Sequence, residues 1–152
     1  MTLILANRQS ARKINVRRLR EITMVLLAEL AGPEAQLEIN LVSPAQMAKV
    51  NQTFLQHEGP TDVITFDYRE ASTGAALKGE LHGELFICPA VAVLQAGEFD
   101  TDWRSELVRY VIHGVLHLLG YDDLEPAARR KMKRVEGRWL RKIARRFALS
   151  KL

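Results

Sequence analysis

The sequence predicts an α+β fold in a single domain, on the basis of chain length, hydrophobic spacing and the absence of internal boundaries. The chain has 152 residues, which suits one domain with one sizeable core. Hydrophobic residues make up 47% of it, and their spacing changes between the period typical of strands and the period typical of helices. No repeat, low-complexity tract or linker interrupts the pattern. We therefore expect one folded unit over residues 1–152.

Four segments have the composition of β-strands. The first, at the start of the chain, reads as an edge strand. The second alternates apolar and polar residues, which indicates a half-buried strand, and the third is rich in β-branched and aromatic residues. The fourth ends an apolar run at Cys88, and a loose loop over residues 72–78 precedes it. The predicted strands span residues 2–7, 37–41, 63–68 and 84–88.

Five segments are predicted helices, and capping residues or prolines mark most of their ends. Asn15 can cap the first helix, which ends before Gly32. A capping box over residues 43–46, with proline at the first helical position, opens the second. Pro89 and Pro126 open the third and fifth helices. The predicted helices span residues 16–31, 44–55, 89–96, 100–119 and 126–147.

The fourth predicted helix carries two histidines, His113 and His117, four residues apart. This spacing puts both imidazoles on one face of a helix. The helix is apolar nearly all round and should be buried, so both imidazoles need partners. Gly120 then offers a left-handed stop, after which Asp122 or Asp123 can return toward the imidazoles. Two nitrogens and one carboxylate oxygen suit zinc and leave a fourth position open, as a catalytic metal requires.

Two histidines at this spacing also occur by chance on ordinary helices, but the apolar neighbours and the Gly-Tyr-Asp-Asp turn favour a shared metal. In the common zinc-protease helix a glutamate follows the first histidine as general base, and here that position is Gly114. Peptide hydrolysis by that route is therefore disfavoured. The proton acceptor must come from elsewhere in the chain or from the substrate.

Residues 113–123 read HGVLHLLGYDD, which resembles the signature HGxLHLxGYDH of the YbeY family of bacterial metal-dependent endoribonucleases. Residues 51–66 resemble a second family block, N-x-x-(F/Y)-R-x-x-D-x-P-T-(D/N)-V-L-S-F, and residues 83–87 resemble G-(D/E)-I-x-I. Met132 and Glu136 fall where the last helix of the family carries Met and Glu. The resemblance covers nearly the whole chain, with its motifs in the family's order.

The resemblance implies a mixed four-stranded sheet flanked by about five helices, with a metal site on the buried helix and the turn after it. It implies that His113, His117 and Asp123 hold one divalent ion, with His113 as the catalytic residue. We expect zinc from this ligand set, with manganese or nickel as alternatives. The implied function is cleavage of RNA in ribosomal-RNA maturation and ribosome quality control, with ribosomal RNA or a ribosomal subunit as partner. No small-molecule organic cofactor is expected.

Asp123 departs from the family, because it aligns with the third metal-binding histidine. A carboxylate preserves three-point coordination but lowers the net charge of the site by one. The ion becomes a weaker Lewis acid, and the preference shifts toward harder ions such as Mn²⁺. The alternative role for Asp123 is to cap the last helix, although Asp122 could serve as that cap instead.

Leu55 is the second departure, because the family usually carries arginine there. Arginine would bind a phosphate and stabilise charge in the transition state, which leucine cannot do. Arg8, Arg12 or Lys13 could reach the site from another segment, and His57 could substitute, although a solvated loop histidine is the simpler interpretation. Both departures support an alternative function, a non-catalytic RNA-binding or ribosome-assembly protein with a structural or degenerate metal site.

The net charge of +4 conceals a strong asymmetry along the chain. Residues 1–20 carry +6, residues 21–124 carry −11 and residues 125–152 carry +9. Basic ends around an acidic middle predict a polyanionic partner, although a solvated helix face is the alternative for the last helix. The candidate RNA-binding residues on that helix are Arg138, Arg141 and Lys142.

Other features indicate a cytoplasmic protein with no membrane partner. No stretch approaches the roughly 20 apolar residues of a membrane span, and the start lacks the basic leader of a signal peptide. The lone Cys88 excludes an internal disulfide and reads as a small buried residue. His82, Thr61 and Thr65 could face the site, but roles in a surface loop, a turn and a strand are simpler.

Overall fold

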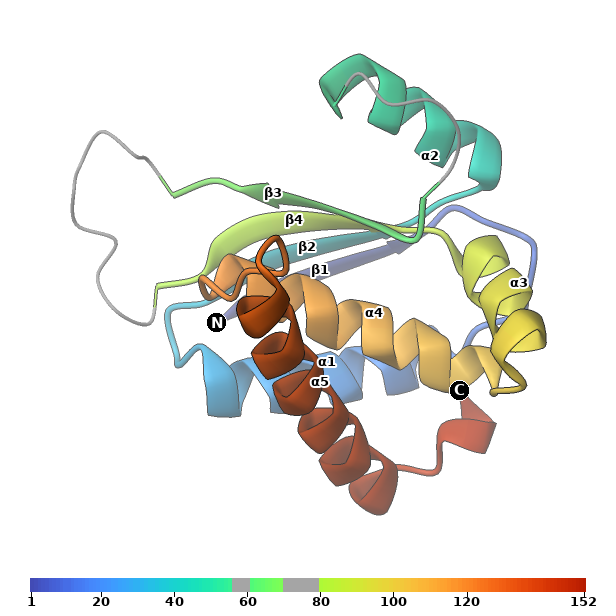
Figure 1. Ribbon diagram of the computed structural model, residues 1–152. Coiled ribbons are helices and arrows are strands. Elements are labelled where there is room, and N and C mark those ends of the chain that lie inside the picture. Colours follow the sequence, from blue (N-terminus) through green and yellow to red (C-terminus); the bar gives the residue numbers. More distant parts are fainter. Residues whose placement is uncertain (56–60, 70–79) are drawn as a thin grey trace.

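The computed structural model describes residues 1–55, 61–69 and 80–152, except for the side chain of Leu55. The predicted loop at residues 72–78 lies outside this part. The elements in chain order are β1 (Thr2–Asn7), α1 (Val16–Leu30), β2 (Gln36–Leu41), α2 (Pro44–Val50), the π-helical turn η1 (Asn51–Leu55), β3 (Val63–Asp67), β4 (His82–Ile87), α3 (Pro89–Phe99), α4 (Trp103–Leu118), α5 (Pro126–Arg146) and the 3₁₀ turn η3 (Leu149–Lys151). Figure 1 shows their arrangement.

The four described strands form one mixed sheet in the order β1-β2-β4-β3. β1, β2 and β4 are parallel, and β3 pairs antiparallel with β4 at the other edge. The predicted edge position of the first strand is therefore confirmed. Parallel neighbours require crossover connections, and α1 supplies the first of them, between β1 and β2. Together with the five α-helices of the described residues, this sheet confirms the predicted fold class.

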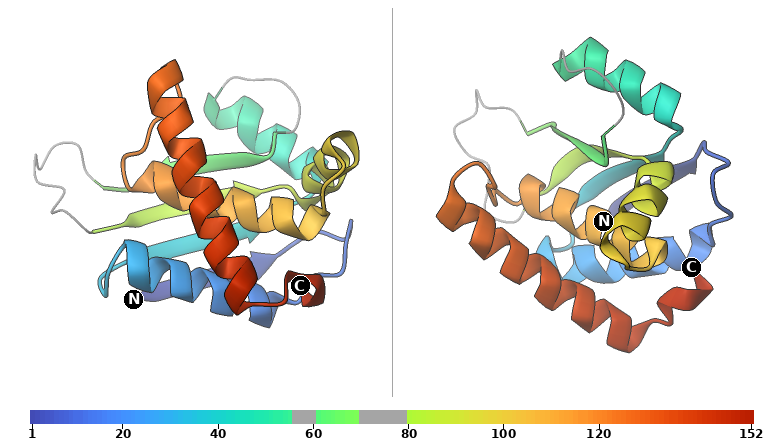
Figure 2. Two further views of the ribbon diagram at one scale, coloured as in Figure 1. Left: turned by 60° about the horizontal axis from the view of Figure 1, so that its bottom comes forward. Right: turned by 45° about the vertical axis from the view of Figure 1, so that its right-hand side comes forward.

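Helices cover the two faces of the sheet unequally. Figures 1 and 2 show α1 and α4 against one face, α5 crossing α4 on the side away from the sheet, and α2 on the opposite face. The main core lies between the sheet and the α1–α4 layer, and its residues include Leu19, Ile22, Ile39, Leu85 and Val111. α4 is therefore a central helix, and one side of it contacts α5.

Two glycines allow α4 to lie close to β4. A Cβ atom added to Gly114 of α4 would lie 2.6 Å from Cδ2 of Leu85 in β4. A Cβ atom added to Gly83 of β4 would lie 2.5 Å from Cδ2 of Leu118 and 2.6 Å from the backbone oxygen of Phe66. At Gly83 the clash includes a backbone atom, so this packing requires glycine there, whereas a side chain at Gly114 would require the buried Leu85 side chain to shift. This close packing fixes the depth of the histidine-bearing turn of α4 relative to the sheet.

The structure changes some details of the predicted elements. The helix predicted over 44–55 is helical over that range, as the α-helix α2 to Val50 and then as the π turn η1. The strand predicted from residue 84 begins at His82, because His82 and Gly83 pair with the first two residues of β2 in the parallel ladder. Cys88 is buried as expected but precedes α3 rather than ending a strand. Among the described residues, no helix combines the length and apolarity that crossing a membrane would require.

Candidate metal centre

The site begins with the two histidines near the end of α4. Asp102 caps this helix by accepting a hydrogen bond from the Arg104 N–H. The helix is buried along most of its length, but the side chains of His113 and His117 keep 31% and 28% of their surface exposed. Their ring centroids lie 4.6 Å apart, which confirms that both imidazoles share one face. The prediction of burial is confirmed for the helix, whereas the imidazoles remain accessible.

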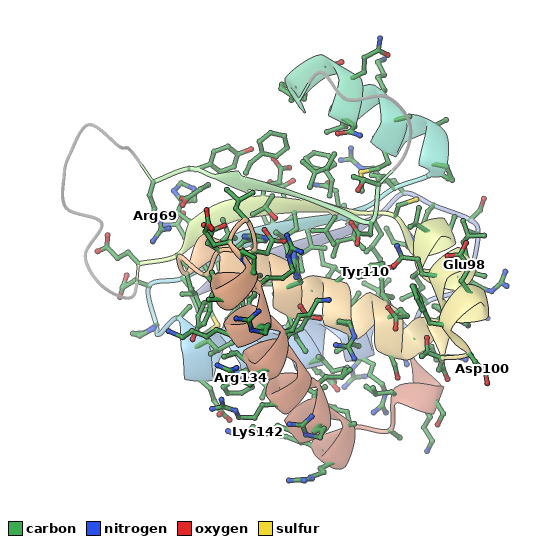
Figure 3. All side chains as sticks on the ribbon, in the orientation of Figure 1. Arg69, Glu98, Asp100, Tyr110, Arg134 and Lys142 are labelled. Carbon is green, nitrogen blue, oxygen red and sulfur yellow. The ribbon has the colours of Figure 1, made fainter. Side chains whose placement is uncertain are left out.

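A Schellman turn ends α4 and reverses the chain. Gly120 has a φ of 99°, the left-handed conformation that glycine adopts without steric cost. Its N–H donates to the His117 oxygen, and the Tyr121 N–H donates to the Leu116 oxygen, the hydrogen-bond pattern of this motif. Arg69, labelled in Figure 3, adds a hydrogen bond of 2.6 Å from its guanidinium to the Leu118 oxygen. The predicted glycine stop is therefore confirmed.

The turn returns Asp123 to the two imidazoles. Oδ2 of Asp123 lies 3.7 Å from Nε2 of His113 and 3.6 Å from Nε2 of His117. One ligand atom from each of these residues lies within 4.8 Å of the others. Ligand atoms about 2.0–2.2 Å from a tetrahedral zinc ion are separated from each other by roughly 3.4 Å. The three side chains therefore fit a zinc ion, and we call them the metal-ligand group.

The alternative role of Asp123 as a helix cap is wrong. The N-cap position of α5 is Glu125, which makes no capping hydrogen bond with its side chain. Asp122 does not cap α5 either, since its carboxylate accepts a hydrogen bond from the Leu124 N–H, two residues along the chain. Both aspartates therefore act within the turn, and only Asp123 belongs to the metal-ligand group.

Hydrogen bonds at the other ring nitrogens set the tautomers of both histidines. Nδ1 of His117 lies 3.1 Å from the Tyr121 oxygen, and Nδ1 of His113 lies 2.8 Å from Oε2 of Glu136. A carbonyl or carboxylate oxygen can only accept, so each Nδ1 carries the hydrogen. In the neutral imidazoles, the Nε2 lone pairs then face Asp123. This arrangement is typical of metal-binding histidines.

Glu136 reaches His113 from α5 and is only 6% exposed. Its second oxygen accepts a hydrogen bond of 3.0 Å from Nη1 of Arg109. Burial by itself lowers the pKa of His113, but the hydrogen bond with Glu136 and the nearby carboxylates outweigh burial and raise it. The role of Glu136 was missed at the level of sequence. The available signal was its position as the one acidic residue of α5, a helix otherwise rich in cations.

A cavity of about 410 Å³ opens beside the metal-ligand group. Cations from α4 and α5 line it together with carboxylates, an amide and apolar side chains. The lining residues are Asp62, Gln95, Phe99, Glu106, Arg109, Tyr110, His113, Asp123, Arg129, Met132, Lys133 and Glu136. Arg138, Arg141 and Lys142 do not line it, because they lie farther along α5, where their side chains are exposed. Figure 3 shows Lys142 near the far end of that helix.

Most of the other candidate residues are not brought to the cavity. Arg8, Arg12 and Lys13 are absent from its lining, and the guanidinium of Arg12 donates to the Ala11 oxygen instead. His82 belongs to β4 rather than a loop, and its exposed ring packs edge-on against Tyr68.

Thr61 and Thr65 lie on or next to β3. Thr61 donates a hydrogen bond to the cavity-lining Asp62, and Thr65 lies in β3. His57 and the side chain of Leu55 lie outside the described residues.

The family model described as "Endoribonuclease YbeY" matches residues 4–144. The chain belongs to the YbeY family. A YbeY relative from Salinibacter ruber, named "Endoribonuclease YbeY", is 38% identical over 110 residues, which are 70% of this chain and 69% of the relative. A relative of the same name from Syntrophotalea carbinolica is 34% identical over 139 residues, 91% of each chain. The expected YbeY membership is confirmed.

A solved structure supports the fold independently of the sequence motifs. The solution structure of TM1509 from Thermotoga maritima matches with a TM-score of 0.68 at 26% identity. The match covers 93% of this chain and 89% of that protein. The fold therefore extends to a protein in which about three quarters of the aligned residues differ.

Proposed function

We propose that this protein is a metal-dependent endoribonuclease that uses zinc at the metal-ligand group. One observation carries the proposal: the imidazoles of His113 and His117 and the carboxylate of Asp123 converge at a cavity that is lined by His113, Asp123 and three cations. A phosphodiester requires both an electrophile for its oxygens and cations for its charge. Relatives named as endoribonucleases support the same reaction.

The protein groups have distinct tasks in this mechanism. A divalent ion held by His113, His117 and Asp123 supplies a Lewis acid for a phosphoryl oxygen or for water. His113 is the proposed catalytic residue through its contact with that ion. Glu136 keeps the His113 imidazole in the ligating tautomer and orientation. Asp123 brings a negative charge where the family has histidine, so we keep manganese, and also nickel, as alternatives to zinc.

We further propose a cytoplasmic role in ribosomal-RNA maturation and ribosome quality control, with ribosomal RNA or a ribosomal subunit as partner. Arg138, Arg141 and Lys142 would contact the RNA beyond the cavity. All three are exposed, and none forms an ion pair with a residue in the part of the chain that the structure describes. Unpaired cations on one long helix suit a polyanionic surface.

The experiment is an RNA-cleavage assay with the purified protein, after its bound metal has been measured. Zinc-loaded protein should cleave a structured RNA, and a chelator or the double substitution His113→Ala and His117→Ala should abolish cleavage. His82→Ala is the matched control, because His82 is exposed on β4 and does not line the cavity. Equal cleavage by the double variant would contradict the proposal. RNA binding without metal-dependent turnover would support the non-catalytic alternative.

A further inference from the structure

We propose that the cavity beside the metal centre is a subsite for one further phosphate of the RNA strand, held by Arg129 and Lys133. This inference rests on the proposed endoribonuclease function and identifies where the strand continues from the metal. The cavity volume of about 410 Å³ is near the lower end of the roughly 300–1,000 Å³ typical of ligand pockets. It therefore suits a single nucleotide rather than a longer segment.

One face of α5 forms the relevant wall. Arg129, Met132, Lys133 and Glu136 all line the cavity, and their spacing of three and four residues places them on the same side of a helix. Glu136, at one end of this wall, lies 2.8 Å from Nδ1 of His113, and Arg129, at the other end, donates a hydrogen bond to the backbone oxygen of Asp123. Lys133 lies between them. Both ends of the wall therefore adjoin the metal-ligand group.

The guanidinium of Arg129 is already held in place. Its Nε donates a hydrogen bond of 3.0 Å to the backbone oxygen of Asp123, which belongs to the metal-ligand group. Within the described residues, the two Nη atoms of Arg129 have no hydrogen-bond partner. A fixed guanidinium with two free nitrogens is suited to bind a phosphate through two hydrogen bonds. Arg129 can thus supply the type of contact that Leu55 cannot.

The charges in the cavity also point to Arg129 and Lys133 as the phosphate-binding residues. Its lining carries four carboxylates, from Asp62, Glu106, Asp123 and Glu136, and three cations. The charge of Arg109 is paired with Glu136, whereas Arg129 and Lys133 form no ion pair with any described residue. The formal charge is −1 without a metal and +1 with a divalent ion. Phosphate binding in the cavity should therefore depend on the ion.

Binding of a labelled 2′-O-methyl uridine decamer, followed by fluorescence anisotropy, tests the subsite without relying on turnover. It is measured at several salt concentrations with zinc-loaded protein and with chelator-treated protein. The double variant Arg129→Gln and Lys133→Gln should bind about tenfold more weakly when zinc is present. The slope of the logarithm of the binding constant against the logarithm of the salt concentration should fall in magnitude by about 0.7, the value for one phosphate of a single strand. Without zinc, the variant and the wild type should bind alike.

Lys49→Gln is the matched control, because Lys49 is an exposed cation on α2, on the other face of the sheet from α5. It should leave binding unchanged in both forms. An equal loss with and without zinc, or no loss with zinc, would overturn the subsite. Cleavage of structured RNA measured in parallel separates the two proposals. If the protein cleaves RNA with zinc but the double variant binds the decamer as the wild type does, the subsite is wrong and the endoribonuclease proposal stands. If the double variant binds more weakly only with zinc but no cleavage occurs, the endoribonuclease proposal is wrong and the phosphate subsite stands.

Discussion

His113 and His117 each direct Nδ1 to a fixed acceptor, and the two acceptors come from different parts of the chain. The Tyr121 oxygen is local, only four residues from His117. The Glu136 carboxylate comes from another helix and is also bound to Arg109. Because the local acceptor is a backbone atom, no substitution removes it easily. Glu136 is therefore the better residue for testing how much orientation contributes to metal binding.

Glu136→Gln should weaken zinc binding by about tenfold or more, the range seen when partners of metal ligands are replaced. The amide keeps the size of the side chain but loses the charge that makes the His113 imidazole more basic. Affinity is measured by competition with a chromogenic chelator. Glu29→Gln on α1 is the control, since Glu29 is exposed and does not line the cavity. Equal zinc affinities for the wild type, Glu136→Gln and Glu29→Gln would show that Glu136 does not contribute to metal binding.

Asp123→His should shift the metal preference toward zinc. A nitrogen ligand replaces a carboxylate oxygen, and hard ions such as Mn²⁺ favour oxygen. The ratio of zinc affinity to manganese affinity should therefore rise relative to the wild type. Competition titrations with both metals measure this ratio. A ratio that stayed the same would mean that the carboxylate of Asp123 is not a ligand.

At the scale of elements, the position of α4 against β4 decides where the histidines lie. Gly114 stands between His113 and His117, and the Leu85 side chain occupies the space that a Cβ atom would need. A larger residue there requires the Leu85 side chain to shift within the core or the helix to move away from the sheet. A movement of the helix would also displace the two imidazoles from Asp123 and from Glu136, which come from separate elements.

Gly114→Ala should destabilise the protein by about 1–2 kcal/mol, because overpacking outweighs the gain in helix propensity. Gly97→Ala is the matched substitution, since nothing lies within 4 Å of the added Cβ atom in α3. It should be neutral or stabilising by up to about 1 kcal/mol. Urea unfolding of the metal-free proteins measures both. Similar effects of the two substitutions would contradict the close packing of α4 on β4.

At the scale of the whole molecule, charge is separated between the ends and the middle of the sequence. The basic C-terminal segment becomes α5, which crosses the helix that carries the metal-ligand group (Figures 1 and 2). The cavity-lining cations Arg129 and Lys133 and the exposed cations farther along α5 therefore belong to the same helix. Arg129 and Arg141 are separated by about 18 Å along the helix, at 1.5 Å per residue.

Replacing Arg138, Arg141 and Lys142 together by glutamine should weaken RNA binding with or without zinc. Each lost phosphate contact lowers the salt slope by about 0.7 for single-stranded RNA, so the slope should fall by about 2. The slope is obtained from binding measurements at several salt concentrations. Cleavage of a dinucleotide too short to reach these residues should be unaffected. A slope equal to that of the wild type would show that these residues do not contact the RNA.

The sequence by itself determined the elements whose signals are local. The spacing of His113 and His117, the left-handed stop at Gly120 and the return of Asp123 all lie within eleven consecutive residues. Hydrogen bonds and sterics over that distance depend on neighbouring residues, so the grouping of these three side chains was predictable. The α+β class followed from periodicity, and the family motifs supplied the sheet that the periodicity alone did not specify.

Only the tertiary structure decided which distant groups surround those ligands. Glu136 meets His113 from 23 residues away, and Arg109, Arg129 and Lys133 come together only because α5 crosses α4. The start of β4 at His82 likewise depended on its partner β2. Such contacts are set by how whole helices and strands pack, and no pattern within a single segment encodes the neighbour that it will meet.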